Sequence, residues 1–255
     1  MSSNVTRALK ILEVLATEAL PMNLDSLAEK AEISPAVAHK LLKLLEASDY
    51  VENTARRGTY KLSLRMPSLG IRYMSTLGIG DISQPIIERL AKDIGEFVVF
   101  GVGSQNGPVW ITKAQGGKTG LRYDQQLGIA APLTSTATGL AWLSRIPEEE
   151  AIRLALENNA LKQGLDGAPS SVPELIECLA KVRKQNWAVA ADTHEMGVTS
   201  VATAFPIARG SAMIATLTIG GPSVRLSPRT ISTLTGKLLA VGAEIAATYS
   251  SVAAA

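Results

Sequence analysis

Apolar residues near the start of the chain recur three and four positions apart, as they do along one side of an amphipathic helix. This spacing predicts a helix over residues 5–17. Ile11 and Val14 form a second apolar strip beside Arg7, wider than one core face needs. We expect this strip to meet a second copy of the chain. The main buried face is predicted to hold Val5, Ala8, Leu9, Leu12, Leu15 and Ala16.

Two further helices are predicted downstream. The first covers residues 24–31 and follows Asn23, whose side chain can cap free backbone N–H groups. The second covers residues 35–47, with Ser34 as its N-cap and Pro35 in its first turn. Its buried stripe is predicted to hold Val37, Leu41, Leu44 and Leu45.

Two short runs of strand-forming residues follow the third helix. "YVEN" (50–53) and "GTYKLS" (58–63) are joined by "TARR", which predicts a hairpin with charged residues at its tip. Three helices and a small hairpin form a winged helix-turn-helix. A connecting helix is then predicted over residues 67–76, ahead of the glycine-rich break "LGIG".

The rest of the chain alternates between strands and helices. "EFVVFGVG" and "PVWITKAQ" flank the turn "SQNG" and predict a hairpin, and "LRYDQ" (121–125) predicts a third strand. Asp81 is expected to cap a helix that ends before Gly95, and Ser171 and Glu174 to form a capping box. This order indicates an α+β domain with helices against a mostly antiparallel sheet. Further strands are predicted over 187–192, 200–208 and 211–220, and helices over 135–145, 148–158, 172–186 and from Ser227 onwards.

The composition is typical of a folded chain. Apolar residues make up 46% of the 255 residues and charged residues 19%, which excludes a disordered protein. No apolar run approaches the roughly 20 residues of a membrane span, and the first residues lack the pattern of a secretory signal peptide. The single cysteine excludes an internal disulfide framework. We therefore expect a cytoplasmic protein without a membrane partner.

The net charge of +2 lies entirely in the N-terminal third. Residues 1–75 hold ten Lys/Arg and eight Asp/Glu, whereas residues 76–255 hold fifteen of each. The basic residues of the first segment gather at 40–43 and 56–65. One group falls on the outward side of the third helix and the other on the hairpin.

A positively charged helix face beside a basic hairpin tip fits the major groove of duplex DNA. Lysines there can contact phosphates or guanine acceptors, and arginines on the wing can reach the flanking backbone or minor groove. The alternative is a solvated amphipathic helix beside a surface hairpin, because charged outward faces are common. The order of the elements, with arginines on the wing, favours DNA binding. The predicted DNA-contacting residues are Ser34, Ala36, His39, Lys40, Lys43, Arg56 and Arg57.

Seven segments, taken in order from about Val5 to Tyr249, resemble those of IclR-type transcriptional regulators. They are "TRALKILEVLA", "NLDSLAEKAEIS", "HKLLKLLEASDYVE", "TYKLSLRMPSLG", "PLTSTATGLAWL", "HEMGVTSVATAFPI" and "LTIGGPSVRL". The resemblance implies a winged helix-turn-helix over residues 1–65, a linker helix over 66–80 and an effector-binding domain, similar to GAF or PAS sensors, over 81–255. It also implies homodimers, often paired as homotetramers, on palindromic operators.

The recognition helix departs from the family pattern. Members carry Ser/Thr-Val-His/Tyr-Arg where this chain has Val37-Ala38-His39-Lys40, so fewer side chains can hydrogen-bond bases. Lysine also lacks the bidentate fork of arginine. Either the operator is read partly through its shape or other residues contribute. Asp49 stands where glycine is usual before the wing, which raises the question of whether the turn there differs.

Three adjacent hydroxyls lie where the chain enters the helix predicted over 135–145. With the free N–H groups of the first turn, they can seat a carboxylate, although a well-capped helix without a ligand is the alternative. The hydroxyls are those of Thr134, Ser135 and Thr136. The resemblance implies that the effector pocket is also lined by Tyr123, Ala131, Ala137, Thr138, Val198, Ser200 and Thr218, and by Asp192, which stands two residues too close to Gly197 for the family spacing.

This mixture of hydroxyls with small and aromatic residues indicates a small polar metabolite, such as an organic acid, as effector. We therefore expect a metabolite-responsive regulator that represses rather than activates. No cofactor is expected, and His39, His194 and Cys178 do not have the spacing of a zinc site.

Two other functions are kept as alternatives. A hydrolase would use Ser135 or Ser200 as nucleophile and His194 as base, although nothing in their spacing supports it. A dimeric ligand sensor without DNA activity would fit the altered recognition helix. Binding to the chain's own upstream DNA would separate the regulator from both.

Overall fold

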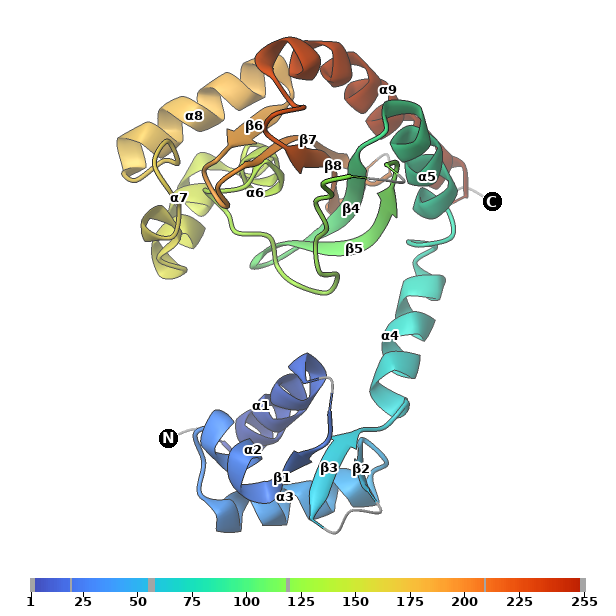
Figure 1. Cartoon of the computed structure of the whole chain (residues 1–255), viewed down its shortest axis with the longest axis vertical. Helices are drawn as coiled ribbons and strands as arrows, with labels where there is room; N and C mark the ends of the chain where they lie inside the picture. The colour runs from blue at the N-terminus through green and yellow to red at the C-terminus, as the bar shows by residue number, and fades with distance from the viewer. Residues whose placement is uncertain (1–2, 19, 55–57, 118–119, 209, 253–255) are drawn as a thin grey trace. The chain divides into compact units, whose positions relative to one another are not determined.

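The computed structural model describes residues 3–18, 20–54, 58–117, 120–208 and 210–252. The chain forms two compact units, residues 1–77 and 78–255 (Figure 1). The basic residues at the tip of the hairpin, Arg56 and Arg57, lie outside the described residues.

The first unit is a winged helix-turn-helix, as the sequence predicts. The side chains of Asn23 and Ser34 accept hydrogen bonds from the backbone N–H groups of Ser26 and Val37, so both predicted N-caps are confirmed. A short strand that the sequence analysis did not predict adds a third member to the wing, giving the antiparallel order β1-β3-β2. The elements are α1 (Asn4–Thr17), β1 (Met22–Asn23), α2 (Leu24–Lys30), α3 (Pro35–Ala47), β2 (Val51–Asn53), β3 (Thr59–Leu62) and α4 (Arg65–Thr76).

The buried face of α1 differs from the prediction. Ile11 and Val14, expected on an outer strip, are buried in the core, whereas Val5 and Leu9 are exposed. The sequence offers two neighbouring apolar strips on this helix, and only packing against α2, α3 and β3 selects between them. The outer strip predicted beside Arg7 is therefore wrong in its residues.

The buried face of α3 is also rotated from its predicted position. Ala38, Leu41 and Leu42 are buried, while Leu44 is 58% exposed. Leu44 therefore lies on the outer side of the helix instead of in its core stripe.

The turn before the wing is made by Asp49. Its φ is +60°, in the left-handed region that glycine adopts without strain and that aspartate tolerates better than most residues. The hydroxyl of Ser63 donates a hydrogen bond to its carbonyl oxygen. Asp49 thus adopts the left-handed backbone conformation that glycine, the usual residue at this position, adopts without strain.

The second unit is built on a five-stranded sheet of order β5-β4-β8-β7-β6 in which every pair is antiparallel. Helices α5 and α9 pack on one face, and α6, backed by α7 and α8, packs on the other (Figure 1). The α+β prediction is confirmed. The elements are α5 (Ser83–Ile94), β4 (Phe97–Ser104), β5 (Gly107–Gln115), α6 (Ala137–Leu143), α7 (Glu148–Glu157), the 3₁₀ turn η1 (Ala160–Lys162), α8 (Val172–Gln185), β6 (Ala188–Ala191), β7 (Val198–Pro206), β8 (Ile214–Pro222) and α9 (Pro228–Val252).

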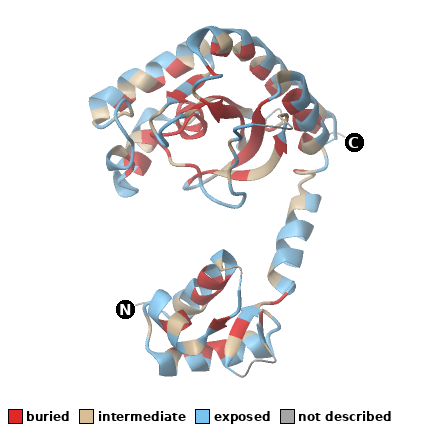
Figure 2. Cartoon of the chain, in the orientation of Figure 1, coloured by how far each residue is buried: buried red, intermediate tan, exposed pale blue. Residues whose placement is uncertain are grey.

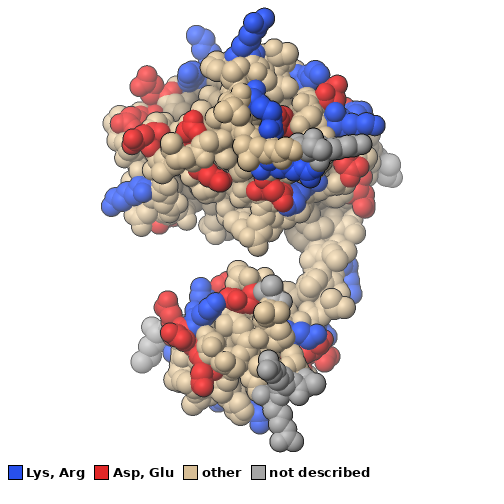
Figure 3. Space-filling view, in the orientation of Figure 1, with Lys and Arg blue, Asp and Glu red and all other residues tan. Residues whose placement is uncertain are grey.

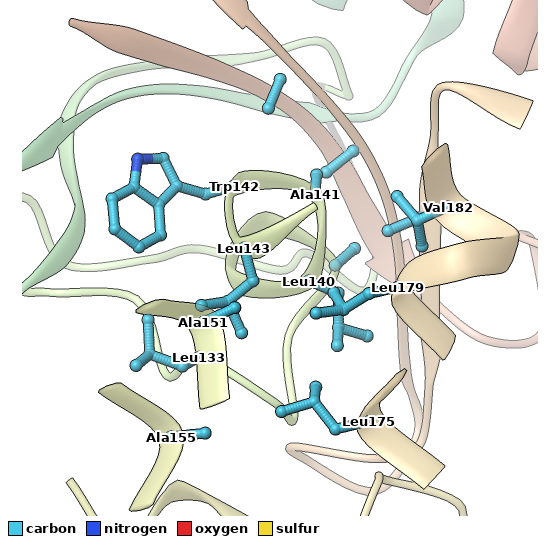
Figure 4. Packing of buried hydrophobic residues seen from close by; sticks show 14 of the residues in the cluster. Leu133, Leu140, Ala141, Trp142, Leu143, Ala151, Ala155, Leu175, Leu179 and Val182 are labelled. Carbon is cyan, nitrogen blue, oxygen red and sulfur yellow. The ribbon is translucent and has the colours of Figure 1, made fainter. Parts of the chain in front are cut away.

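Helix α6 is the centre of the larger core in this unit. All of its residues are buried, which Figure 2 shows as a short red helix beside the sheet. In Figure 4 Leu140 points toward Leu179 of α8 and Leu143 toward Ala151 of α7, while Trp142 extends to the opposite side. The helix is therefore held by apolar contacts on every side.

Three local predictions need correction or refinement. Residues 121–125 do not form a strand, because side chains take the carbonyl oxygens that a neighbouring strand would need. Asp81 does not cap α5, which begins at Ser83 without a side-chain cap. The capping box of α8 is present, but the Glu174 carboxylate accepts from the backbone N–H of Ser170 at 2.9 Å.

The close packing of α6 gives a stability prediction. A Cβ on Gly139 would lie 2.3 Å from the carbonyl oxygen of Pro132, a backbone atom that cannot move aside cheaply. We expect Gly139→Ala to lower the free energy of unfolding of this unit by about 3 kcal/mol, because the helix would be pushed from its seat.

Gly236 in α9 is the matched control, since a Cβ there would meet nothing within 4 Å. Gly236→Ala should raise the stability by about 0.5–1 kcal/mol through helix propensity. Urea unfolding followed by circular dichroism measures both, and equal effects of the two substitutions would contradict the packing described for α6.

Candidate functional sites

The outer face of α3 carries the first candidate site. Ala36, His39, Lys40 and Lys43 are all exposed there, as the sequence predicts, and the exposed Leu44 joins them. Lys40 and Lys43 form no ion pair within the described part of the chain. Both ammonium groups are therefore available to an external anion.

Figure 3 shows charged side chains of both signs on the second unit. Lysine and arginine side chains there are interspersed with aspartate and glutamate. Several of the cations are also paired, such as Arg153 with Glu150 and Glu157. These paired cations differ from Lys40 and Lys43, for which the described residues offer no ion pair.

The second candidate site is a cavity on the face of the sheet that α6 covers. Side chains of a strand alternate between faces, and the antiparallel register places Phe97 beside Gly220, Val99 beside Thr218, and Ser200 beside Gly220 on this face. The cavity lies between these strands, the start of α6 and two loops. Its lining residues are Phe97, Val99, Trp110, Tyr123, Gln125, Thr136, Thr138, Ala190, Thr193, His194, Glu195, Val198, Ser200, Thr218 and Gly220.

A chain of buried polar groups lies deep in the cavity. The indole Nε1 of Trp110 donates to Thr138 Oγ1 at 3.3 Å, and this oxygen lies 2.8 Å from Thr218 Oγ1. Thr136 is also engaged, because its hydroxyl donates to the carbonyl of Pro132 at 2.7 Å and accepts from the N–H of Gly139 at 3.0 Å. These hydrogen bonds join α6 to β5 and β8 at the site.

Tyr123 closes one side of the cavity. Its ring meets Phe97 edge-on at 5.5 Å between centroids, and a Cβ on Gly220 would lie 3.1 Å from it. Its hydroxyl donates to Gln125 Oε1 at 2.7 Å. Burial, followed by the negative charges of Glu195 and Asp124, raises the pKa of Tyr123 to about 12, so the phenol stays protonated at neutral pH.

Residues 121–125, which we call the flap, are held in place by side chains of the sheet and of the loop after β8. Lys113 Nζ donates to the carbonyl of Gln125 at 2.8 Å, and Gln115 donates to that of Tyr123 at 2.6 Å. Arg225 donates to the carbonyl of Leu121 at 2.9 Å. The flap therefore has a defined conformation without belonging to the sheet.

The same arginine forms the most buried ion pair of the unit's described residues. Its Nε and Nη2 donate to the two carboxylate oxygens of Glu96 at 2.5 and 2.7 Å, and Glu96 is only 8% exposed. One side chain thus neutralises a buried carboxylate and fixes the flap.

The cavity is nearly closed in this conformation. Its volume of about 20 Å³ accommodates roughly one water molecule. Sites for small organic ligands usually enclose roughly 300–1,000 Å³. A metabolite can therefore enter only if the flap or the loop that carries His194 and Glu195 moves outward.

Comparisons with known proteins agree with this arrangement of two units. The family described as "Bacterial transcriptional regulator IclR C-terminal" matches residues 71–247, and the "IclR helix-turn-helix domain" matches residues 4–55. The chain belongs to the IclR family of bacterial transcriptional regulators.

Individual relatives are distant but extend over nearly the whole chain. The HTH-type transcriptional repressor AllR of Salmonella typhi is 25% identical over 221 residues, which cover 87% of this chain and 80% of that protein. The solved IclR of Thermotoga maritima shares the fold with a TM-score of 0.73 at 23% identity, covering 96% of this chain and 98% of that one. An IclR homologue of Microbacterium hydrocarbonoxydans, solved in complex with 4-hydroxybenzoate, has a TM-score of 0.76 at 17% identity, over 95% of this chain and 99% of its own.

The structure divides the predicted effector residues of this IclR-family regulator into two groups. Those that line the cavity are Tyr123, Thr136, Thr138, Val198, Ser200 and Thr218. Ala131 is buried behind the cavity with Trp110, and Ala137 lies in the core around α6. Thr134 donates to the carbonyl of Ala160 at 2.7 Å and faces away from the cavity.

Asp192 also lies outside the cavity lining. Its carboxylate accepts from the N–H of Gly197 at 2.6 Å and from the Ser223 hydroxyl at 3.0 Å, and its φ is +58°. The aspartate therefore stabilises the loop that carries His194 and Glu195.

Sequence reasoning missed part of the cavity wall. Phe97 and Val99 are two residues apart on β4, so their side chains point to the same face of the sheet. This alternation, extended across the predicted hairpin to Trp110, could have identified these three residues as one wall of the cavity. The other missed lining residues are Gln125, Ala190, Thr193 and Glu195.

The structure brings together two groups that the hydrolase alternative invoked. Ser135 Oγ lies 3.3 Å from His194 Nδ1, but Ser135 is not among the described residues that line the cavity. The family and the relatives are transcriptional regulators, not enzymes. The contact is therefore a structural one between the segment before α6 and the loop that joins β6 to β7.

Within the described residues no group of three or more His, Cys, Asp or Glu could hold a metal ion. No described helix is both long and apolar enough to cross a membrane.

Because the ion pair of Arg225 is buried at its carboxylate, we expect two arginine substitutions to lower the free energy of unfolding by different amounts. Arg225→Met should lower the free energy of unfolding by about 2–3 kcal/mol, because it leaves the buried Glu96 carboxylate unpaired while Arg225 itself is partly exposed. Arg89→Met removes the exposed pair with Glu244 and should cost at most about 1 kcal/mol.

Urea unfolding measures both substitutions, and hydrogen exchange of residues 121–125 should quicken only in Arg225→Met. Equal losses of stability, or unchanged exchange in the flap, would show that Arg225 does not hold this segment.

Proposed function

We propose that this IclR-family regulator is a metabolite-responsive repressor that binds a palindromic operator as a homodimer. The observation that carries the proposal is the exposed, unpaired basic face of α3 in one unit, together with a closed cavity in the other. The repressor role is supported by the name of the AllR relative. Homotetramers remain an expectation from the family resemblance.

In the proposed complex α3 enters the major groove. Lys40 and Lys43 contact phosphates or guanine acceptors, while His39 and Ser34 offer hydrogen-bonding groups to bases. Leu44 offers an apolar contact for thymine methyl groups. Ala36 allows the helix to approach closely, and the proposed wing contacts are Arg56 and Arg57.

The alternative of a sensor without DNA activity depends on the departures at Val37 and Lys40, because the third departure, Ala38, is buried. Ala38 is one of the departures from the family pattern on the recognition helix, but its side chain lies in the core. It therefore removes no contact to a base.

The proposed dimer forms through exposed apolar residues of the first unit. Helix α4 has no buried residue, and Leu69, Ile71 and Tyr73 are exposed on it. Val5 and Leu9 are exposed on α1 and replace Ile11 and Val14 in our proposal. An isolated helix of this length is marginal in water, so a partner is needed to stabilise it.

The effector is proposed to bind in the cavity beside α6. Phe97, Trp110 and Tyr123 offer aromatic surfaces to a ligand with a small apolar body. The Microbacterium relative, solved with 4-hydroxybenzoate, indicates that the fold can hold a ligand with one ring. Because entry must displace the flap or the opposite loop, binding is coupled to a conformational change. Such coupling is typically worth ~1–3 kcal/mol, or roughly 5–150-fold in operator affinity.

DNA binding is tested by replacing the two lysines of α3. Lys40→Ala with Lys43→Ala should weaken binding to a fragment of the chain's own upstream DNA. The slope of log K against log salt should become less steep by about 2, because each phosphate contact contributes about 0.9.

Lys181→Ala with Lys184→Ala is the matched control, since these lysines have the same spacing on the exposed side of α8. Gel-shift titrations at several salt concentrations measure the slope. An unchanged slope in the α3 variant would show that these lysines do not contact DNA phosphates. If the unaltered protein did not bind the fragment, the DNA-binding proposal would be overturned.

Dimerisation is tested on α4. Ile71→Asp places a charge in the proposed interface and should weaken the dimer at least tenfold, because a carboxylate would have to lose its water there. Leu156→Asp, at an exposed position of α7, should leave association unchanged. Sedimentation velocity over a range of concentrations measures both, and a dimer of full strength in Ile71→Asp would place the interface elsewhere.

A further inference from the structure

The charge of the cavity lining differs from what a carboxylate effector needs. No lysine or arginine belongs to the described residues that line it. The lining groups that can carry a charge are His194, Glu195 and Tyr123, and burial keeps the phenol of Tyr123 protonated at neutral pH. Among the described residues, the cavity lining therefore offers no permanent positive charge.

Two cations that contact the flap from outside it are already paired with carboxylates. Lys113 Nζ lies 2.7 Å from the carboxylate of Asp124, and Arg225 forms a two-bond pair with Glu96. Both also donate to carbonyl groups of the flap. Recruiting either cation to an anionic ligand would break the contacts that position Tyr123.

The remaining polar groups are neutral donors and acceptors. Thr138, Thr218 and Ser200 supply hydroxyls, and Gln125 supplies an amide. Helix α6 adds little charge, because it has only seven residues and Thr136 already occupies the N–H of Gly139. Such groups can satisfy a ligand's amide or hydroxyl, but they do not balance a full negative charge in a closed cavity.

Negatively charged side chains lie beside the cavity. Glu195 lines the cavity and its charge, with that of Asp124, acts on the phenol of Tyr123 and adds to the effect of burial. A carboxylate in this cavity would face the charge of Glu195, whereas that of Asp124 is paired with Lys113. An uncharged ligand would not be repelled by the carboxylate of Glu195.

We propose that the effector is an uncharged single-ring molecule that carries amide or hydroxyl groups, and that Glu195 discriminates against carboxylates. This rests on the proposed effector role of the cavity. The organic acid expected from the sequence is the competing outcome, so acid and amide forms of the same ring give the sharpest test.

The experiment measures the binding of matched acid and amide pairs to the full-length protein. The probes are 4-hydroxybenzamide against 4-hydroxybenzoate, and nicotinamide against nicotinate, by calorimetric titration at pH 8, where imidazole groups are ordinarily neutral. We expect at least one amide to bind ten times or more tightly than its acid.

Two variants test the role of Glu195. Glu195→Gln should narrow the amide-to-acid ratio at least threefold by strengthening the acid, whereas Glu149→Gln, exposed on α7, should leave it unchanged. An acid that binds as tightly as its amide, or no binding by either pair, overturns the proposed ligand class. A ratio unaffected by Glu195→Gln overturns the assigned role of Glu195. These results are independent of the gel-shift titrations, which alone decide the DNA-binding part of the proposed function.

Discussion

The packing of α6 against one face of the five-stranded sheet is the constraint on which the cavity depends. The helix is too short to be stable alone, and it is held by apolar contacts with α7 and α8 on one side and by the sheet on the other. Thr138 then meets Thr218 and Trp110 through hydrogen bonds that are buried and directional. A shift of α6 would leave these polar groups unpaired, so the site and the core are stabilised together.

The flap shows how a segment without regular structure can be positioned by electrostatics. Three side chains donate to its carbonyl groups, and two of these donors are cations already paired with carboxylates. The arrangement places an aromatic ring over the cavity while leaving little net positive charge beside it. The flap closes the cavity although it is not a strand of the sheet, because these side-chain contacts hold it in place.

The two units differ in how their surfaces relate to their cores. The winged helix-turn-helix uses a small aliphatic core to present α3, and it leaves apolar residues exposed on α1 and α4. The effector unit hides its functional groups on an inner face of the sheet. Binding of a large polyanion needs an exposed surface, whereas recognition of a small molecule needs enclosure, and each unit has the geometry that its partner requires.

The sequence by itself determined the kinds and order of most elements, since these follow from local periodicity, capping residues and turns, but it missed β1 and predicted a strand over 121–125 that does not form. It also predicted the outward basic residues of α3, because a charged side chain avoids the core wherever the helix is placed. It could not choose between the two apolar strips of α1 or place Leu44, because both alternatives have the same helical period and only the neighbouring elements select one.

The cavity was predictable only in part for a related reason. Thr138 and Thr218 come from segments 80 residues apart, and they meet only because α6 packs on the face of the sheet to which β8 contributes Thr218. Thr134, Ser135 and Thr136 look equivalent in the sequence, yet successive residues entering a helix point in different directions, and only Thr136 reaches the cavity. Tertiary structure decided which hydroxyls face a ligand and which stabilise the fold, because that choice depends on what packs against each side of the chain.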